Sequence, residues 1–105
     1  MQTRLLYLFT RTPLHVGAGS SVGAIDQPII RERHTGFPII PGSSLKGVLA
    51  DLWASDTTTD AKGKTSRDLA KEIAWLFGSD SDTAPSAGAL SLGEARLLAF
   101  PIRSA

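Results

Sequence analysis

The chain has 105 residues, 42% of them hydrophobic, and a formal net charge of +1 at neutral pH. This length suits one small domain, and the modest charge does not by itself indicate a nucleic-acid-binding protein. Because cysteine is absent and only two histidines occur, disulfides and thiolate metal sites are excluded, and a zinc site is not expected.

Two further features bound the function. The sequence contains neither a signal-sequence pattern nor an apolar run long enough to span a membrane, so we expect a cytoplasmic protein. Charge is distributed unevenly, since five basic residues and only two acidic ones occur up to residue 50. Any anion-binding face should therefore be built from the first half of the chain.

Residues 3–11 are predicted to form a strand, because large apolar side chains alternate along them. Leu5, Tyr7 and Phe9 would occupy one face and two further leucines the other, so both faces are expected to be buried. Such a strand usually lies in the middle of a sheet.

A glycine-rich loop is predicted after Pro13, over residues 14–23. Gly17 and Gly19 lack the third glycine of a dinucleotide-binding loop, and no helical pattern follows them, which excludes a Rossmann motif. These glycines and Ser20 supply backbone N–H groups without side-chain obstruction. This arrangement suits a phosphate or RNA backbone lying close by.

The segment 24–35 reads as a loop that runs into an extended stretch, since Pro28 disfavours helix at the residue before it. Asp26 is the only acidic residue among the first thirty, and it is interpreted either as a turn-capping carboxylate or as a functional one. A basic cluster follows, which would either straddle a phosphate chain or line a solvated edge strand. Its members are Arg31, Arg33 and His34.

Residues 36–49 predict a strand-to-helix elbow, made of a short buried strand, a sharp turn and the start of a helix. Pro38 and Pro41 confine the strand to residues 39–40 at an edge or end of a sheet. Gly42 permits a tight turn before a serine N-cap. The helix then carries an apolar stripe expected to face the core, which consists of Leu45, Val48, Leu49, Leu52 and Trp53.

The front of this helix is a candidate anion site. Its first backbone N–H groups have no partner within the helix, and the helix dipole places partial positive charge there. Ser43 and Ser44 add hydroxyl groups and Lys46 adds a cation in the first turn, which together favour a phosphate. The plainer interpretation is that the serines cap the helix and the lysine is solvated.

Residues 55–64 are polar and predict a flexible loop, and residues 79–88 predict another. Between them, the spacing of Thr65 and Asp68 matches a capping box and predicts the opening of a second helix. Gly78 would end that helix in the left-handed conformation. The core stripe of this helix is predicted to be Leu69, Ile73, Leu76 and Phe77.

A final strand is predicted over residues 89–100, with a bulge or bend at Gly93. The order strand, loop, strand, helix, loop, helix, strand predicts an α+β fold with helices packed on a sheet. A ferredoxin-like unit needs four strands and two helices, and the sequence supplies only about three strands. We therefore expect residues 1–105 to be either the N-terminal part of a single domain or a protomer that is completed by another chain.

Three motifs stand in the order and spacing of a known family, at residues 14–21, 26–38 and 40–47. They resemble the RAMP superfamily of CRISPR proteins, and within it the backbone subunit of type III-B (Cmr) effector complexes. Residues 76–78 and 88–92 are similar to the family's next landmarks. The type III-A backbone subunit shares the aspartate and the Pro-Gly-Ser-Ser-Leu-Lys-Gly elbow, and the Arg-Glu-Arg-His-Thr-Gly run favours type III-B.

The resemblance implies a ferredoxin-like or RRM-like RAMP fold, and cleavage of target RNA that is paired with a guide crRNA. Copies of the subunit would stack in a helical filament along the crRNA, together with other Cmr subunits. The resemblance also implies that Asp26 is required for cutting, in a reaction that depends on a divalent metal such as Mg²⁺ or Mn²⁺ and leaves a cyclic phosphate. Asp26 would either hold the metal or accept the proton of the attacking 2′-OH.

Other site residues follow with alternatives. His15 is interpreted either as an auxiliary acid or base or as a structural hydrogen-bonding residue. The residues expected to contact RNA are Gly17, Gly19, Ser20, Arg31, Arg33, Ser43, Ser44 and Lys46. Two further interpretations stay open, namely a purely structural RNA-binding subunit in which Asp26 caps its loop, and a small phosphate-binding domain unrelated to CRISPR.

Overall fold

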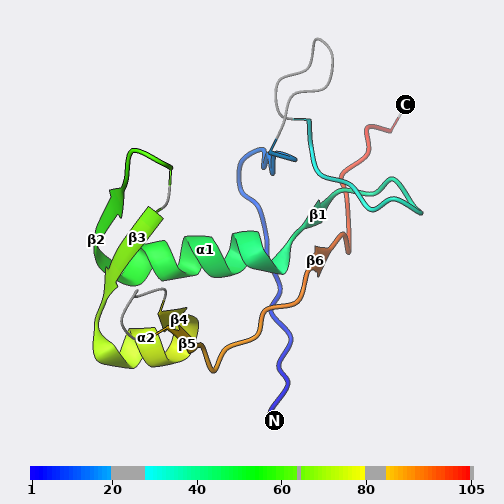
Figure 1. Cartoon of the computed structure of the whole chain (residues 1–105). Helices are drawn as coiled ribbons and strands as arrows, with labels where there is room; N and C mark the ends of the chain where they lie inside the picture. Colours follow the sequence, from blue (N-terminus) through cyan, green and yellow to red (C-terminus); the bar gives the residue numbers. More distant parts are fainter. Residues whose placement is uncertain (20–27, 64, 80–84, 105) are drawn as a thin grey trace. The chain divides into compact units, whose positions relative to one another are not determined.

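The computed structural model of the chain describes residues 1–19, 28–63, 65–79 and 85–104. The chain divides into two units, Met1–Pro38 and Ile39–Ala105. All named helices and strands lie in the second unit, and together they form a mixed α+β structure (Figure 1). Their order is β1 (Ile39–Ile40), α1 (Gly42–Trp53), β2 (Ala54–Thr59), β3 (Thr65–Leu69), α2 (Lys71–Phe77), β4 (Gly78–Ser79), β5 (Ser86–Ala87) and β6 (Ala95–Arg96).

The first unit is held by short antiparallel backbone pairings. Gly17 bridges to Ile29, and the N–H groups of Ala18 and Ile30 donate across the pair to carbonyl oxygens at 2.8 and 2.9 Å. The chain then folds back on itself over residues 31–38, where a second bridge joins the two ends of that segment.

The predicted strand over residues 3–11 is not formed in the structure. These residues have no regular secondary structure, and their apolar side chains are exposed, from 48% at Leu8 to 92% at Phe9. A strand exists only when a neighbour completes its ladder of N–H and C=O groups. The alternating pattern is therefore that of a strand for which the described residues supply no partner.

The elbow predicted at residues 36–49 is present as β1 followed by α1. β1 pairs antiparallel with β6, with Ile39 opposite Arg96. The predicted serine N-cap is wrong, because Pro41 is the N-cap residue and makes no side-chain cap. Its ring sets φ at −60°, so α1 begins at Gly42 and both serines lie inside the helix.

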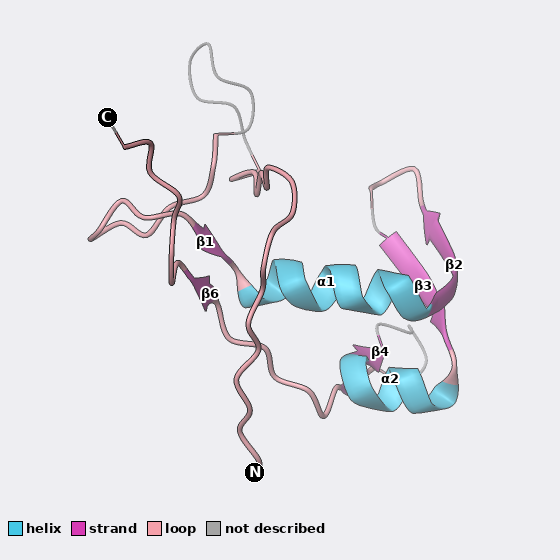
Figure 2. Ribbon diagram, turned by 180° about the vertical axis from the view of Figure 1, so that it is seen from behind, coloured by secondary structure: helices cyan, strands magenta, loops and turns pink. Residues whose placement is uncertain are grey.

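The core of the second unit is small and lies where α1 and α2 pack side by side (Figure 2). Ala50 and Phe77 are its buried residues, and the ring of Trp53 lies 5.6 Å from that of Phe77. The predicted stripe of α1 is largely wrong, since Val48, Leu52 and Trp53 are 61%, 72% and 51% exposed. A face with small residues packs inward instead, because small side chains allow neighbouring backbones to come close.

A β-hairpin replaces the predicted loop at 55–64 and the predicted helix start at 65–68. β2 and β3 pair antiparallel and end with Thr59 opposite Thr65. Consecutive β-branched threonines in β2 favour strand over coil. With its first residues committed to β3, the second helix begins only at Lys71.

α2 ends with Gly78 as its C-cap residue, as the sequence predicts, and the φ of Gly78 is positive at 92°. Its ψ is 168°, so the predicted left-handed helical cap is replaced by an extended conformation. The predicted strand over 89–100 shrinks to β6, because the N–H groups of Ala89 and Leu90 donate instead to carbonyl oxygens of α2 at 3.0 and 2.9 Å. In the predicted stripe of this helix Phe77 is buried, and its other members are half-buried. Neither helix of the described chain has the length and apolar character needed to cross a bilayer.

Candidate functional site

The start of α1 carries the serines predicted to bind an anion. Ser43 and Ser44 are exposed, and neither caps the helix. The N–H of Leu45 donates to the carbonyl oxygen of Pro41 at 3.2 Å, so the N–H groups before it have no partner in the helical ladder. No acidic residue stands in the first turn. Unpaired N–H groups, hydroxyls and the positive end of the dipole together suit an anion.

Lys46 stands one turn further along than the sequence indicated. It is the fifth residue of α1 and therefore opens the second turn, on the same face as Gly42. Its side chain is half-buried, as expected when the aliphatic stem lies along the protein and the ammonium group reaches water. Helical side chains incline toward the N-terminus, so from this position a lysine can reach back toward the serines.

Gly42 fixes the start of α1 against the segment that precedes β6. A Cβ at this position would overlap the carbonyl oxygen of Leu92 and lie 3.0 Å from that of Gly93. Its φ is outside the left-handed region, so glycine is required here for close approach and not for the turn that the sequence predicted. The candidate anion-binding end of the helix is thus positioned by contact between two backbone segments.

The glycine-rich loop of the first unit connects two paired segments. Gly17 belongs to the bridge with Ile29, and Gly19 takes φ of 85°, a conformation that favours glycine. A Cβ on Gly19 would meet no atom within 4 Å. Backbone here is therefore open to a ligand, while Ser20 lies outside the described residues.

The two predicted catalytic residues are not brought together by the described structure. Asp26 lies outside the described residues. His15 is exposed and already interacts with another group. The described ranges hold no group of three or more His, Cys, Asp or Glu residues that fits a metal ion. They therefore do not form the predicted metal site by themselves, and Asp26 stays its candidate ligand.

The basic cluster lies on a closed turn at residues 31–37. The N–H of Glu32 donates to the carbonyl oxygen of Phe37, and the N–H of Gly36 donates to that of Glu32, both at 2.8 Å. The guanidinium Nη1 of Arg31 donates to the carbonyl oxygen of Gly36 at 2.9 Å. Arg31 thus helps to close the turn, so its donors are not all available to a phosphate.

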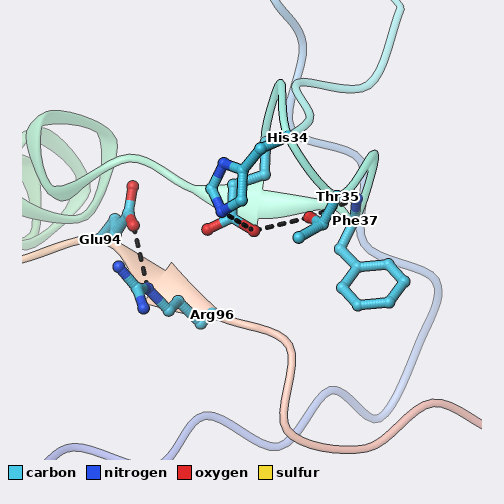
Figure 3. A network of polar contacts seen from close by, with 6 residues as sticks. His34, Thr35, Phe37, Glu94 and Arg96 are labelled. Atoms are coloured by element: carbon cyan, nitrogen blue, oxygen red, sulfur yellow. Dashed lines mark hydrogen bonds and ion pairs between the residues drawn. The ribbon is translucent and has the colours of Figure 1, made fainter.

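Side chains close the same turn from within (Figure 3). Thr35 Oγ1 donates to Glu32 Oε2 at 2.6 Å and accepts from the N–H of Phe37 at 3.2 Å. His34 Nε2 lies 3.6 Å from the same Glu32 oxygen. Sequence reasoning missed Glu32 and Thr35. The available signal was a threonine before glycine, since hydroxyls often bind a backbone N–H two residues on.

Arg96 is a further cation that sequence reasoning did not single out. It stands on β6, and its Nε donates to Glu94 Oε1 at 3.0 Å (Figure 3). The two side chains are 75% and 38% exposed, so the pair contributes little to stability. Its charge is matched by the glutamate, which makes Arg96 a weaker candidate for RNA contact than Lys46.

Comparison with known proteins places these features in a family. The sequence model of the RAMP superfamily matches residues 8–105. The chain is 43% identical over 105 residues to the CRISPR system Cmr endoribonuclease Cmr4 of Pyrococcus furiosus, covering 99% of this chain and 32% of that protein. It is 39% identical over 87 residues to the CRISPR system Cms endoribonuclease Csm3 of Enterococcus italicus, covering 80% and 41%.

A second Csm3, from Methanothermobacter thermautotrophicus, is 36% identical over 84 residues, which cover 77% of this chain and 34% of that protein. The chain thus spans roughly a third of the length of the curated relatives it matches. No solved structure shows a significant match.

Proposed function

This chain belongs to the RAMP superfamily, and from that premise we propose that it is part of the backbone subunit of a type III-B CRISPR effector complex. The subunit would bind crRNA and cut complementary target RNA in the cytoplasm. The observation that carries the proposal is the 43% identity over 99% of the chain to a Cmr endoribonuclease. The type III-A alternative is less well supported, because the Csm3 relatives are less identical over a smaller share of the chain.

The complete subunit would have a ferredoxin-like or RRM-like RAMP fold, of which α1, α2 and the short strands form part. Its partners would be crRNA, target RNA, further copies of the subunit in a helical filament, and other Cmr subunits. Such a protein needs few base-specific side chains, because pairing with the guide selects the target. The first requirement on this chain is therefore to hold an RNA backbone.

The start of α1 supports that role. Ser43 and Ser44 are exposed beside backbone N–H groups without helical partners, and Lys46 stands one turn behind them. Phosphates bind at such helix ends. Open backbone at Gly19 in the glycine-rich loop would give a second contact without reading sequence.

We propose that Asp26 takes part in the cut itself. In the expected reaction the ribose 2′-oxygen forms a bond to the adjacent phosphorus while the bond from phosphorus to the 5′-oxygen breaks. The 2′ proton passes to a base, the leaving 5′-oxygen takes up a proton, and the products are a 2′,3′-cyclic phosphate and a 5′-hydroxyl. Asp26 is the candidate base and His15 the candidate auxiliary acid or base.

A divalent cation, Mg²⁺ or Mn²⁺, stays part of the proposal, with Asp26 as a ligand. Carboxylate oxygen suits such hard cations, which neutralise charge that develops on phosphate oxygens. The described residues do not complete such a site by themselves. Chelation followed by readdition of Mg²⁺ or Mn²⁺ tests whether cutting depends on it.

Replacing Asp26 by Asn in the native complex tests the proposed function. Cutting of a complementary target should be abolished while crRNA content and target binding are retained, since only a carboxylate is lost. The matched control is Asp60→Asn, because Asp60 is exposed and its Oδ1 accepts the N–H of Lys62 at 2.9 Å, a bond that asparagine can keep. Unchanged cutting by the Asp26 variant would favour the purely structural RNA-binding subunit.

A further inference from the structure

The turn at residues 31–37 holds more internal contacts than a solvated turn needs. Two backbone hydrogen bonds, a guanidinium-to-carbonyl bond, two bonds of Thr35 Oγ1 and a His34–Glu32 contact all lie within seven residues. Gly36 completes the turn with φ of 72°. A turn closed in this way holds its tip in one conformation, which lowers the entropy lost when the tip binds a partner.

The tip presents two basic side chains to solvent. Arg33 is exposed and forms no ion pair within the described residues, and the side chain of His34 is 76% exposed. Arg31 differs, because its Nη1 donates into the turn at Gly36. The three basic residues therefore have different roles, one closing the turn and two facing solvent.

Glu32 and Thr35 lie beneath this tip. The side chain of Glu32 is only 14% exposed, and one of its oxygens both accepts the Thr35 hydroxyl and lies beside His34. Resting on the proposed function, we infer that Glu32 and Thr35 are positioning residues that hold Arg33 and His34 toward RNA phosphates. They act through the tip and do not themselves touch RNA.

The direction in which RNA affinity changes when Glu32 is replaced distinguishes a positioning role from that of a merely solvated charge. A carboxylate near an RNA-binding surface repels phosphates, so its removal should strengthen binding if that were all it did. If Glu32 instead positions the tip, its removal should weaken RNA binding, because the tip loses its fixed conformation. Thr35 carries no charge, so its replacement tests the positioning role without this electrostatic contribution.

The test measures RNA affinity of the native protein at several salt concentrations. Arg33→Ala should reduce the slope of log K against log salt by about 0.7, the value for one lost contact with single-stranded RNA. Thr35→Val removes both hydrogen bonds of Oγ1 and should weaken binding by at least about fivefold, the factor that corresponds to one net hydrogen bond. Thr35→Ser should restore binding. Lys62→Ala, which removes an exposed cation in the β2–β3 turn, is the control for charge alone.

A double-mutant cycle decides whether Thr35 acts through Arg33. Thr35→Val should have a clearly smaller effect once Arg33 is alanine, because only His34 is then left to be positioned. An equal loss in both backgrounds overturns the inference, as does tighter RNA binding by Glu32→Ala together with no effect of Thr35→Val. If the unmodified protein binds RNA and all turn variants match it, the inference fails alone; if the unmodified protein binds no RNA, the proposed function fails with it.

Discussion

Replacing Gly42 by Ala tests whether the start of α1 is set by contact between two backbones. The added methyl group would overlap the carbonyl oxygen of Leu92 and lie 2.9 Å from its carbonyl carbon, whereas ordinary contact is 3.4–4 Å. Overpacking of this kind costs about 1–3 kcal/mol, and the gain in helix propensity is at most about 1 kcal/mol. Backbone atoms have no alternative rotamer, so we expect an overpacking cost near the upper end, about 3 kcal/mol. After the gain in helix propensity, the net loss of stability is about 2 kcal/mol.

The assay is urea unfolding of the native protein, followed by far-UV circular dichroism. A loss of about 2 kcal/mol lowers the midpoint by about 1 M when the slope m is about 2 kcal/mol per M. RNA affinity should fall in parallel, because the helix end that carries Ser43 and Ser44 must move away from Leu92.

Gly93→Ala is the matched control in the same region. A Cβ there would meet nothing within 4 Å, and the φ of Gly93 lies outside the left-handed region, so stability should change by less than about 0.5 kcal/mol. Equal midpoints for the Gly42 and Gly93 variants would refute the close approach of α1 to Leu92.

Three further changes test other parts of the molecule. Gly78→Ala should destabilise the protein by about 2 kcal/mol, because a side chain at φ of 92° is strained and its Cβ would lie 2.8 Å from the carbonyl oxygen of Ser86; a shift in the urea midpoint measures this. Phe77→Ala should cost about 3 kcal/mol and alter the fluorescence of Trp53, whose ring lies 5.6 Å from it; an unchanged spectrum would contradict their packing. Lys46→Ala should reduce the salt slope of RNA binding by about 0.7, and an unaltered slope would remove Lys46 from the interface.

The elements that the sequence predicted correctly are those with local causes. α1 and β1 follow from proline and glycine positions and from helical spacing, and Gly78 ends α2 by its own freedom of φ. The β2–β3 hairpin was missed because its polar threonines suggest a loop by composition, although β-branching favours strand. The capping-box spacing at residues 65–68 predicted a helix start that is not formed, because pairing of β3 with β2 overrides a local helix signal.

The predictions that were wrong concern strands whose pairing partners are distant in sequence. Residues 3–11 and 89–100 alternate as strands do, yet neither pattern specifies what completes the ladder. Large apolar side chains in both segments are more than half exposed, among them Tyr7, Phe9 and Leu98. Apolar patterning thus correctly identified surfaces suited to burial, and the described residues do not provide enough neighbours to bury them.

In the candidate site, too, residues with local signals were predicted and residues that act through wider contacts were missed. Ser43, Ser44 and Lys46 were predicted from one local motif, and the structure brings them together at one helix end. Glu32 and Thr35 were missed because their role lies in a side-chain network that residue types alone do not reveal. The backbone contact at Gly42 was likewise hidden, since it depends on a segment some fifty residues away.

The exposed run from Leu5 to Phe9 has a consequence for how the protein is made in the cell. Five consecutive large apolar side chains, without charge or proline, form the kind of segment that stacks into cross-β aggregates when left uncovered. The yield of folded protein would then depend on two competing rates, that at which a partner segment covers residues 5–9 and that at which newly made chains associate through them. Chaperone availability and the rate of synthesis, more than final stability, would set how much protein reaches its working state.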